Sequence, residues 1–143
     1  MDTPQKKMHV LIIDDDEIMR RLFGSLLGNA GYEVLYAKDG DEGREVARRL
    51  HPDLILLDIN MPGPDGYKTA NSIKNEPGSP TADIPIVFLT NTDLPIEMLK
   101  WMKDFGVTDY IHKGVTNEEF VEKINKIFAE KHPATEADGS QTR

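Results

Sequence analysis

The sequence predicts an α/β fold in which five parallel strands form one doubly wound sheet with helices on both faces. Short apolar runs of about five residues alternate five times with amphipathic segments along the chain. Such alternation is typical of a mainly parallel sheet that is covered by helices on both sides. Five strands are too few for an eight-stranded barrel, so we expect an open sheet.

The five expected strands are rich in β-branched residues, which favours strands over short buried helices. They are His9–Ile13, Glu33–Ala37, Leu54–Leu57, Ile84–Leu89 and Val107–Ile111.

The five expected helices are indicated by apolar residues spaced three or four positions apart. In chain order, these stripes are Ile18, Met19, Leu22, Phe23, Leu26 and Leu27; Val46, Ala47 and Leu50; Tyr67, Ala70 and Ile73; Ile96, Leu99, Met102 and Phe105; and Phe120, Val121, Ile124, Ile127 and Phe128. Gly28 and Gly31 are expected to close the first helix, and Pro52 to stop the second. Thr116, followed three residues later by Glu119, predicts a capping box at the start of the last.

The chain of 143 residues fits one domain with short flanking segments. We expect an N-terminal extension over residues 1–7, the domain over residues 8–131, and a disordered C-terminal tail over residues 132–143. The tail contains Pro, Gly, Ser and Thr and has no apolar face.

The composition excludes several classes of function. The chain has no cysteine, so it forms no disulfide and no thiolate metal site. Twenty-five acidic residues against 17 basic ones give a net charge of -8, which argues against a nucleic-acid-binding surface. Neither a signal peptide nor a run of about 20 apolar residues is present, so we expect a soluble, cytoplasmic protein without a membrane partner.

Polar side chains follow four of the five expected strands. Asp14–Asp16 follow the first strand, Asp58 the third and Thr90 the fourth, while Lys113 closely follows the fifth. In an open parallel sheet, ligands bind outside these carboxyl ends of the strands. Asp16 also has a purely structural interpretation as a helix N-cap, so the joint occurrence carries the prediction rather than any one residue.

This set of groups suits phosphoryl transfer. Two carboxylates about 4 Å apart repel each other by roughly 4 kcal/mol at an effective dielectric constant of about 20, which favours a cation between them. Carboxylates suit Mg²⁺. Lys113 supplies a second positive charge and Thr90 a hydroxyl donor, and Asp58 is the expected nucleophile for an aspartyl phosphate.

Four strings carry a family resemblance: LIIDDDEIMRRLF, PDLILLDINMPGPDGY, IPIVFLTN and DYIHKGVT. At these strings the chain, from Val10 to about Lys131, resembles the chemotaxis-regulator-like receiver domain of two-component response regulators. The resemblance implies a flavodoxin-like fold with strand order 2-1-3-4-5. It also implies that Asp58 accepts a phosphoryl group from a sensor histidine kinase or a histidine phosphotransfer protein.

The resemblance further assigns the metal ligands. It implies that Asp15 and Asp58 coordinate Mg²⁺, that Asp14 assists through water, and that the backbone carbonyl of Asn60 completes the protein ligands.

The resemblance also implies a switch. Lys113 would pair with the phosphoryl group or with the Asp58 carboxylate, Thr90 would move toward the phosphoryl group, and Tyr110 would follow from an outward to an inward rotamer. The face altered would comprise the fourth helix, fifth strand and fifth helix, to which a downstream protein target or kinase binds. Such a module is not an enzyme beyond its own phosphorylation and dephosphorylation. The alternative is that Tyr110 is only an edge-strand aromatic.

Two residues depart from the family pattern. Gly114 follows Lys113 where the family usually has a proline after a cis peptide bond. Because a cis bond before a non-proline residue costs about 2.5–4 kcal/mol, we expect this bond to be trans. Asn91 stands where Ala or Ser is common, and is expected to crowd or hydrogen-bond the phosphoryl group.

The sequence disfavours two other classes of function. A Mg²⁺-dependent phosphohydrolase with an aspartate nucleophile usually has a second Asp two residues later, but here that position is Asn60. A flavodoxin-like cofactor binder needs a Gly-rich phosphate loop after the first strand, where this chain has Asp14–Asp16. On the fourth helix, Leu99 and Met102 fill the apolar stripe, so an exposed Trp101 would favour a partner contact.

Overall fold

The computed structural model describes residues 6–61 and 66–131, in which strands and helices alternate. The strands are β1 (His9–Ile13), β2 (Glu33–Ala37), β3 (Leu54–Asp58), β4 (Ile86–Thr90) and β5 (Val107–His112). The helices are α1 (Glu17–Asn29), α2 (Gly40–Leu50), α3 (Gly66–Asn75), α4 (Ile96–Phe105) and α5 (Asn117–Lys131). All neighbouring strands are parallel, in the order β2-β1-β3-β4-β5. The predicted fold class and strand order are confirmed.

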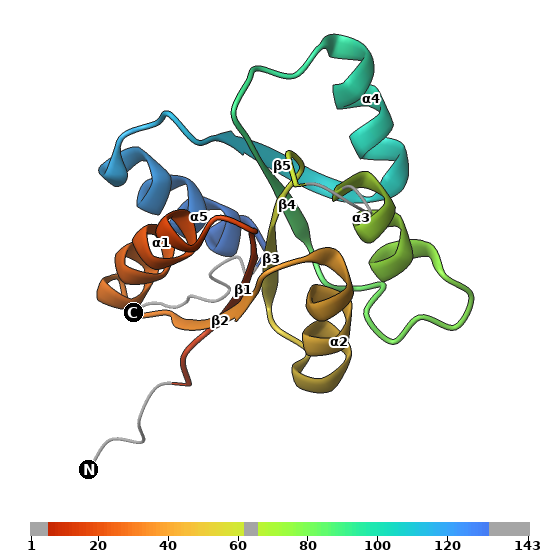
Figure 1. The fold of residues 1–143 in the computed structure, drawn as a ribbon, viewed down its shortest axis with the longest axis horizontal. Helices are drawn as coiled ribbons and strands as arrows, with labels where there is room; N and C mark the ends of the chain where they lie inside the picture. The colour runs from red at the N-terminus through yellow and green to blue at the C-terminus, as the bar shows by residue number, and fades with distance from the viewer. Residues whose placement is uncertain (1–5, 62–65, 132–143) are drawn as a thin grey trace, which may run out of the picture.

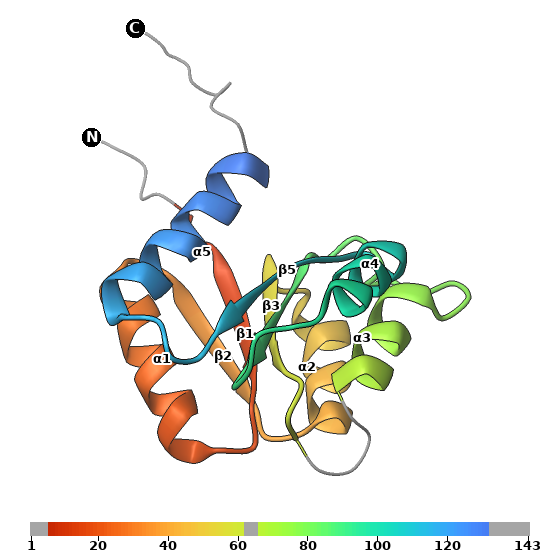
Figure 2. The ribbon, with the colours of Figure 1, turned by 90° about the horizontal axis from the view of Figure 1, so that it is seen from above.

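Helices cover both faces of the sheet (Figures 1 and 2). Side chains alternate across each strand, so Leu11 and Ile13 pack toward α2, α3 and α4, whereas Val10 and Ile12 pack toward α1 and α5. Because both faces are covered, β3 and β4 are buried along their whole length, which explains their continuous apolar runs.

The strand order reverses direction next to β1. From β1 the chain crosses to β2 on one side, and then returns to β3 on the other. The carboxyl ends of β1 and β3 therefore lie side by side at the point of reversal, which is the expected place for a site in such a sheet.

Four strand boundaries differ from the prediction. The fourth strand begins at Ile86 rather than Ile84, because Pro85 has no N–H to donate to the ladder. Ile84 instead donates its N–H to the carbonyl of Thr81 in a turn, at 3.1 Å. The third, fourth and fifth strands each extend one residue further than expected, to Asp58, Thr90 and His112.

The predicted apolar stripe of α1 is only partly buried. On α1, Ile18 and Leu22 are 75% and 39% exposed, while Phe23 is buried and its ring stacks on Phe120 of α5 at 4.5 Å. The predicted stripe of six residues is wider than the surface that the sheet and α5 can cover.

Trp101 on α4 is half-buried. The partner contact that was expected for an exposed Trp101 is therefore not supported. Its ring stacks on Phe105, with 3.9 Å between centroids, and meets Tyr67 of α3 edge-on at 4.9 Å. Ile96 and Leu99 are the exposed apolar residues of this helix. The helix is thus rotated to bury its largest aromatic side chain, which removes more apolar surface from water.

Two predicted caps are confirmed. The side chain of Asp16 accepts the N–H groups of Ile18 and Met19 at the start of α1. At the start of α5, the N–H of Thr116 donates to the Glu119 carboxylate (2.9 Å), and the N–H of Glu119 donates to the Thr116 hydroxyl (3.1 Å).

Within the described residues, none of the helices has the length and apolar character that a membrane span requires. Residues 1–5, most of the predicted N-terminal extension, and residues 132–143, the predicted tail, lie outside the described part of the chain.

Candidate functional site

Three carboxylates gather at the carboxyl edge of the sheet. Ile13 pairs with Leu57 in the β1·β3 ladder, so the next residues, Asp14 and Asp58, leave neighbouring strands side by side. Asp14, Asp15 and Asp58 each offer a carboxylate oxygen within 4.8 Å of the others. Asp14 and Asp58 are buried, at 0% and 2% exposed, and Asp15 is exposed.

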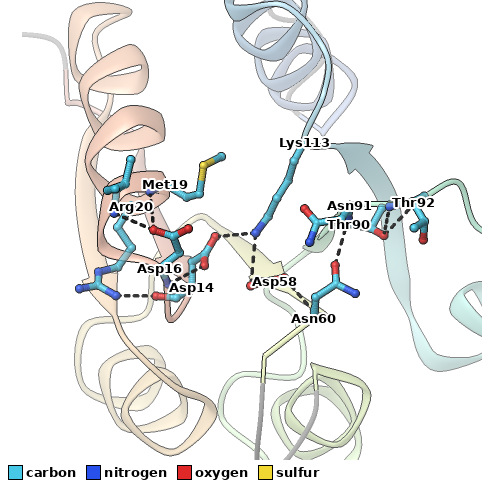
Figure 3. A network of polar contacts seen from close by, with 11 residues as sticks. Asp14, Asp16, Met19, Arg20, Asp58, Asn60, Thr90, Asn91, Thr92 and Lys113 are labelled. Atoms are coloured by element: carbon cyan, nitrogen blue, oxygen red, sulfur yellow. Dashed lines mark hydrogen bonds and ion pairs between the residues drawn. The ribbon is translucent and has the colours of Figure 1, made fainter.

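Lys113 reaches this cluster from the end of β5 (Figure 3). Its Nζ lies 3.0 Å from Oδ2 of Asp14 and 3.3 Å from Oδ2 of Asp58. Its backbone N–H donates to the carbonyl of Thr90 at 2.8 Å, which ties the residue to β4. The structure thus brings together four of the predicted site residues, Asp14, Asp15, Asp58 and Lys113.

The environment changes the acidity of the buried groups. The pKa of Asp58 is raised from its ordinary 3.8 to about 6, first by burial and also by the neighbouring charge of Asp14, although the Asn60 N–H (2.8 Å) and Lys113 act in the opposite direction. Burial alone would lower the pKa of Lys113, but Asp14 and Asp58 outweigh it, so this pKa is raised. Lys113 therefore stays charged, and Asp58 is mostly ionised at neutral pH.

The donor set fits a divalent cation. One lysine faces two buried carboxylates and one exposed carboxylate, so the site keeps excess negative charge. Oδ2 of Asp14 is buried and, although ion-paired with Lys113, accepts no hydrogen bond of good geometry from the described residues. A cluster made only of carboxylate oxygens, one of them without a hydrogen-bond donor, matches the ligand preference of Mg²⁺.

The loop after β1 is held by contacts that the sequence did not predict. The N–H of Asp16 donates to Oδ1 of Asp14 at 2.9 Å, and Nη1 of Arg20 donates to the carbonyl of Asp14 at 2.6 Å. Arg20 stands one helical turn after the cap at Asp16, and this spacing was the only signal that could have found it.

The hydroxyl of Thr90 is engaged in the loop between β4 and α4. Oγ1 donates to the carbonyl of Thr92 at 2.9 Å and accepts the Thr92 N–H at 3.1 Å. The next residue, Asn91, donates its N–H to Oδ1 of Asn60 at 3.0 Å, which links this loop to the one after β3. The predicted movement of Thr90 toward a phosphoryl group would break its bonds to Thr92.

Tyr110 lies on β5, half-buried against the core on the α2–α4 side of the sheet. It borders a groove of about 450 Å³, to which β5, α5 and the loop between β4 and α4 contribute. Its predicted rotamer change stays a prediction. No cis peptide occurs among the described residues, so the bond between Lys113 and Gly114 is trans, as expected.

Comparison with known proteins identifies the family. Residues 10–125 match the response regulator receiver domain. The chain belongs to this family. Protein PilH of Pseudomonas aeruginosa is 32% identical over 120 residues, which cover 84% of this chain and 97% of PilH. The chemotaxis response regulator CheY4 of Vibrio cholerae has the same fold, with a TM-score of 0.77 and 29% identity over 85% of this chain and 99% of CheY4.

Other relatives are longer. A probable transcriptional regulator, ycf27, of Porphyridium aerugineum is 32% identical over 123 residues, which are 86% of this chain and 49% of that protein. The chain thus spans about half the length of this relative and nearly all of PilH. A receiver domain is in general a signalling module rather than an enzyme, which disfavours the phosphohydrolase alternative.

Proposed function

We propose that this receiver domain is the phosphoacceptor of a two-component phosphorelay and that Asp58 takes the phosphoryl group. One observation carries the proposal. The buried carboxylate of Asp58, at the end of the central strand, lies 3.3 Å from the ammonium of Lys113, and shares its surroundings with Asp14 and Asp15. The donor is a sensor histidine kinase or a histidine phosphotransfer protein, as expected of the family.

The chemistry requires an ionised nucleophile and neutralisation of charge. A carboxylate oxygen of Asp58 attacks the phosphorus atom, the bond from phosphorus to the donor's imidazole nitrogen breaks, and that nitrogen keeps the electron pair. With its pKa near 6, Asp58 carries the negative charge that the attack requires at pH 7. Lys113 offsets the charge that accumulates on the oxygens and holds the carboxylate in place.

Mg²⁺ is the proposed cofactor. Asp14, Asp15, Asp58 and the backbone carbonyl of Asn60 would hold it, with water filling other positions. When bound, it supplies positive charge beside the phosphoryl oxygens.

A phosphoryl group changes what the neighbouring side chains can bind. It brings about two negative charges and three acceptor oxygens to the edge of the sheet. Thr90 can then exchange its bond to Thr92 for a bond to a phosphoryl oxygen, and Lys113 gains a stronger partner. Interactions that differ between the two states shift the population of conformations.

The proposed output surface is formed by α4, β5 and α5, because Thr90 ends β4 and Tyr110 lies on the neighbouring strand, β5. The groove beside Tyr110 offers a downstream protein target or kinase a place to bind. The net charge of -8 favours protein partners over nucleic acid for this domain. We place the domain in the cytoplasm, where sensor kinases present their phosphohistidine.

The test is incubation with a small phosphodonor and Mg²⁺, followed by intact mass spectrometry. We expect one added phosphoryl group in the wild type and none in Asp58→Asn. Asp53→Asn is the matched control, because Asp53 precedes the opposite end of β3, and it should be labelled like the wild type. Labelling that persists in Asp58→Asn would show that another residue is the acceptor.

A further inference from the structure

The segment that carries Lys113 into the site is a tight turn between β5 and α5. Lys113 is fixed at both ends, because its N–H bonds to the carbonyl of Thr90 and its Nζ pairs with the two buried aspartates. The N–H of Val115 returns to the carbonyl of His112 at 3.2 Å. Within this turn, Gly114 is the residue with the widest backbone freedom, since glycine has no Cβ.

The side chain of His112 removes much of that freedom. The N–H of Gly114 donates to Nδ1 of His112 at 2.8 Å. A Cβ added at Gly114 would lie 3.0 Å from both Nδ1 and Cε1 of the ring, so the imidazole lies directly against the glycine backbone. This bond from a side chain to the N–H two residues later is the pattern with which Asn and Asp side chains commonly stabilise turns.

The bond defines the state of the imidazole. Nδ1 accepts a main-chain N–H, so it carries no proton, and the ring proton of the neutral side chain is on Nε2. The position of the Lys113 side chain depends on this turn, because a change in the backbone dihedrals of Gly114 would redirect the neighbouring main chain from which that side chain extends.

We propose that His112 is a positioning residue for phosphoryl transfer: by accepting the Gly114 N–H, it holds the turn that aims Lys113 at Asp58. The inference rests on the proposed function and deepens it. His112 touches neither reacting atom. Its ring nitrogen accepts a hydrogen bond that fixes the backbone of the turn, which the flexible glycine alone would leave free to vary.

Two substitutions separate this role from simple packing. His112→Phe keeps an aromatic ring and removes the acceptor, whereas His112→Asn loses the ring but offers Oδ1 to the same N–H. Initial rates of phosphorylation by a small phosphodonor with Mg²⁺ are followed by intact mass. We expect His112→Phe to be about three- to tenfold slower, the range set by the loss of one neutral hydrogen bond, and His112→Asn to stay within about twofold of the wild type.

The phosphorylation rates of the two variants, compared with that of the wild type, test the proposal. A His112→Phe rate equal to that of the wild type, or a His112→Asn rate as low as that of His112→Phe, overturns the role of the acceptor. In either case labelling of the wild type leaves the proposed function intact. Absence of labelling in the wild type itself would instead refute the proposed function.

A second measurement uses the wild type alone and does not depend on whether any variant folds. Two-bond ¹H–¹⁵N correlation spectra of the wild type at about pH 9, where histidine side chains are neutral, report the tautomer of each ring. The signals of His112 are expected to show the proton on Nε2 and a bare Nδ1. A proton on Nδ1 would be incompatible with the bond to Gly114 and would overturn the proposal.

Discussion

Replacing Asp58 by Asn should stabilise the protein, although it destroys the proposed acceptor. The ionised carboxylate of Asp58 is buried next to Asp14, and its raised pKa records the free-energy cost of that charge. Asparagine is nearly isosteric, and its Oδ1 can still accept the N–H of Asn60. The substitution therefore removes mainly the buried charge.

The magnitude follows from the pKa of Asp58. Below pH 3.8 the side chain is protonated in both the folded and unfolded states, so its charge costs nothing. Between pH 3.8 and about 6 the unfolded chain releases the proton while the folded chain keeps it, so the free energy of unfolding of the wild type falls as the pH rises. At about 1.4 kcal/mol per pH unit, the full cost above pH 6 is about 3 kcal/mol. This cost already includes the attraction between Asp58 and Lys113, which lowers the pKa, so we expect a gain of about 2–3 kcal/mol in Asp58→Asn at pH 7.5.

The assay is urea unfolding of wild type and Asp58→Asn in a chelating buffer at pH 7.5 and near pH 4. Asp15→Asn is the matched control, because Asp15 belongs to the same cluster but is exposed, and its substitution should change the free energy by less than about 0.5 kcal/mol. The gain of Asp58→Asn should be confined to the higher pH. An equal gain at both pH values, or none at pH 7.5, would refute the assignment of the cost to the buried charge.

Three further predictions concern the site and its support. Mg²⁺ at a fixed concentration, tenfold its dissociation constant at pH 7.5, should raise the free energy of unfolding of the wild type by about 1.4 kcal/mol at pH 7.5, measured by urea unfolding. The same concentration should raise it by less below pH 6, and a change independent of pH would contradict ligation by Asp58. Lys113→Met should raise the pKa of Asp58 further, as followed by carboxyl ¹³C NMR, because it removes the nearby positive charge; an unchanged pKa would exclude the ion pair in solution. Gly66→Ala should lower the free energy of unfolding by about 1–3 kcal/mol in thermal or urea unfolding, because the added Cβ would lie 2.8 Å from the Cα of Ile59. Gly28→Ala is the control, because its added Cβ would have no neighbouring atom within 4 Å. Equal costs for the two substitutions would refute the steric argument.

The strand ends were predictable because their geometry follows from the topology. Once five short parallel strands are assigned, their carboxyl ends must share one edge, so Asp14, Asp58 and Lys113 had to lie near one another. Pro85 similarly could have marked the start of β4, since proline cannot donate to the ladder.

Side-chain contacts within loops were not predictable in the same way. The bond from Thr90 to Thr92 and the link from Asn91 to Asn60 depend on side-chain rotamers and loop dihedrals that no periodicity encodes. The exposure of Ile18 could not be predicted from the sequence either, because the rotation of a helix about its axis is set by the surface on which it packs.

The central claim is that Asp14, Asp15 and Asp58 hold one divalent cation beside a reactive carboxylate. Paramagnetic broadening of amide signals by Mn²⁺, titrated in place of Mg²⁺, tests it most directly. The account predicts that broadening begins at the loops after β1 and β3, includes Asp15 and Asn60, and is competed away by Mg²⁺ and lost in Asp14→Asn. Broadening centred on any other part of the domain, or unchanged in that variant, would contradict it.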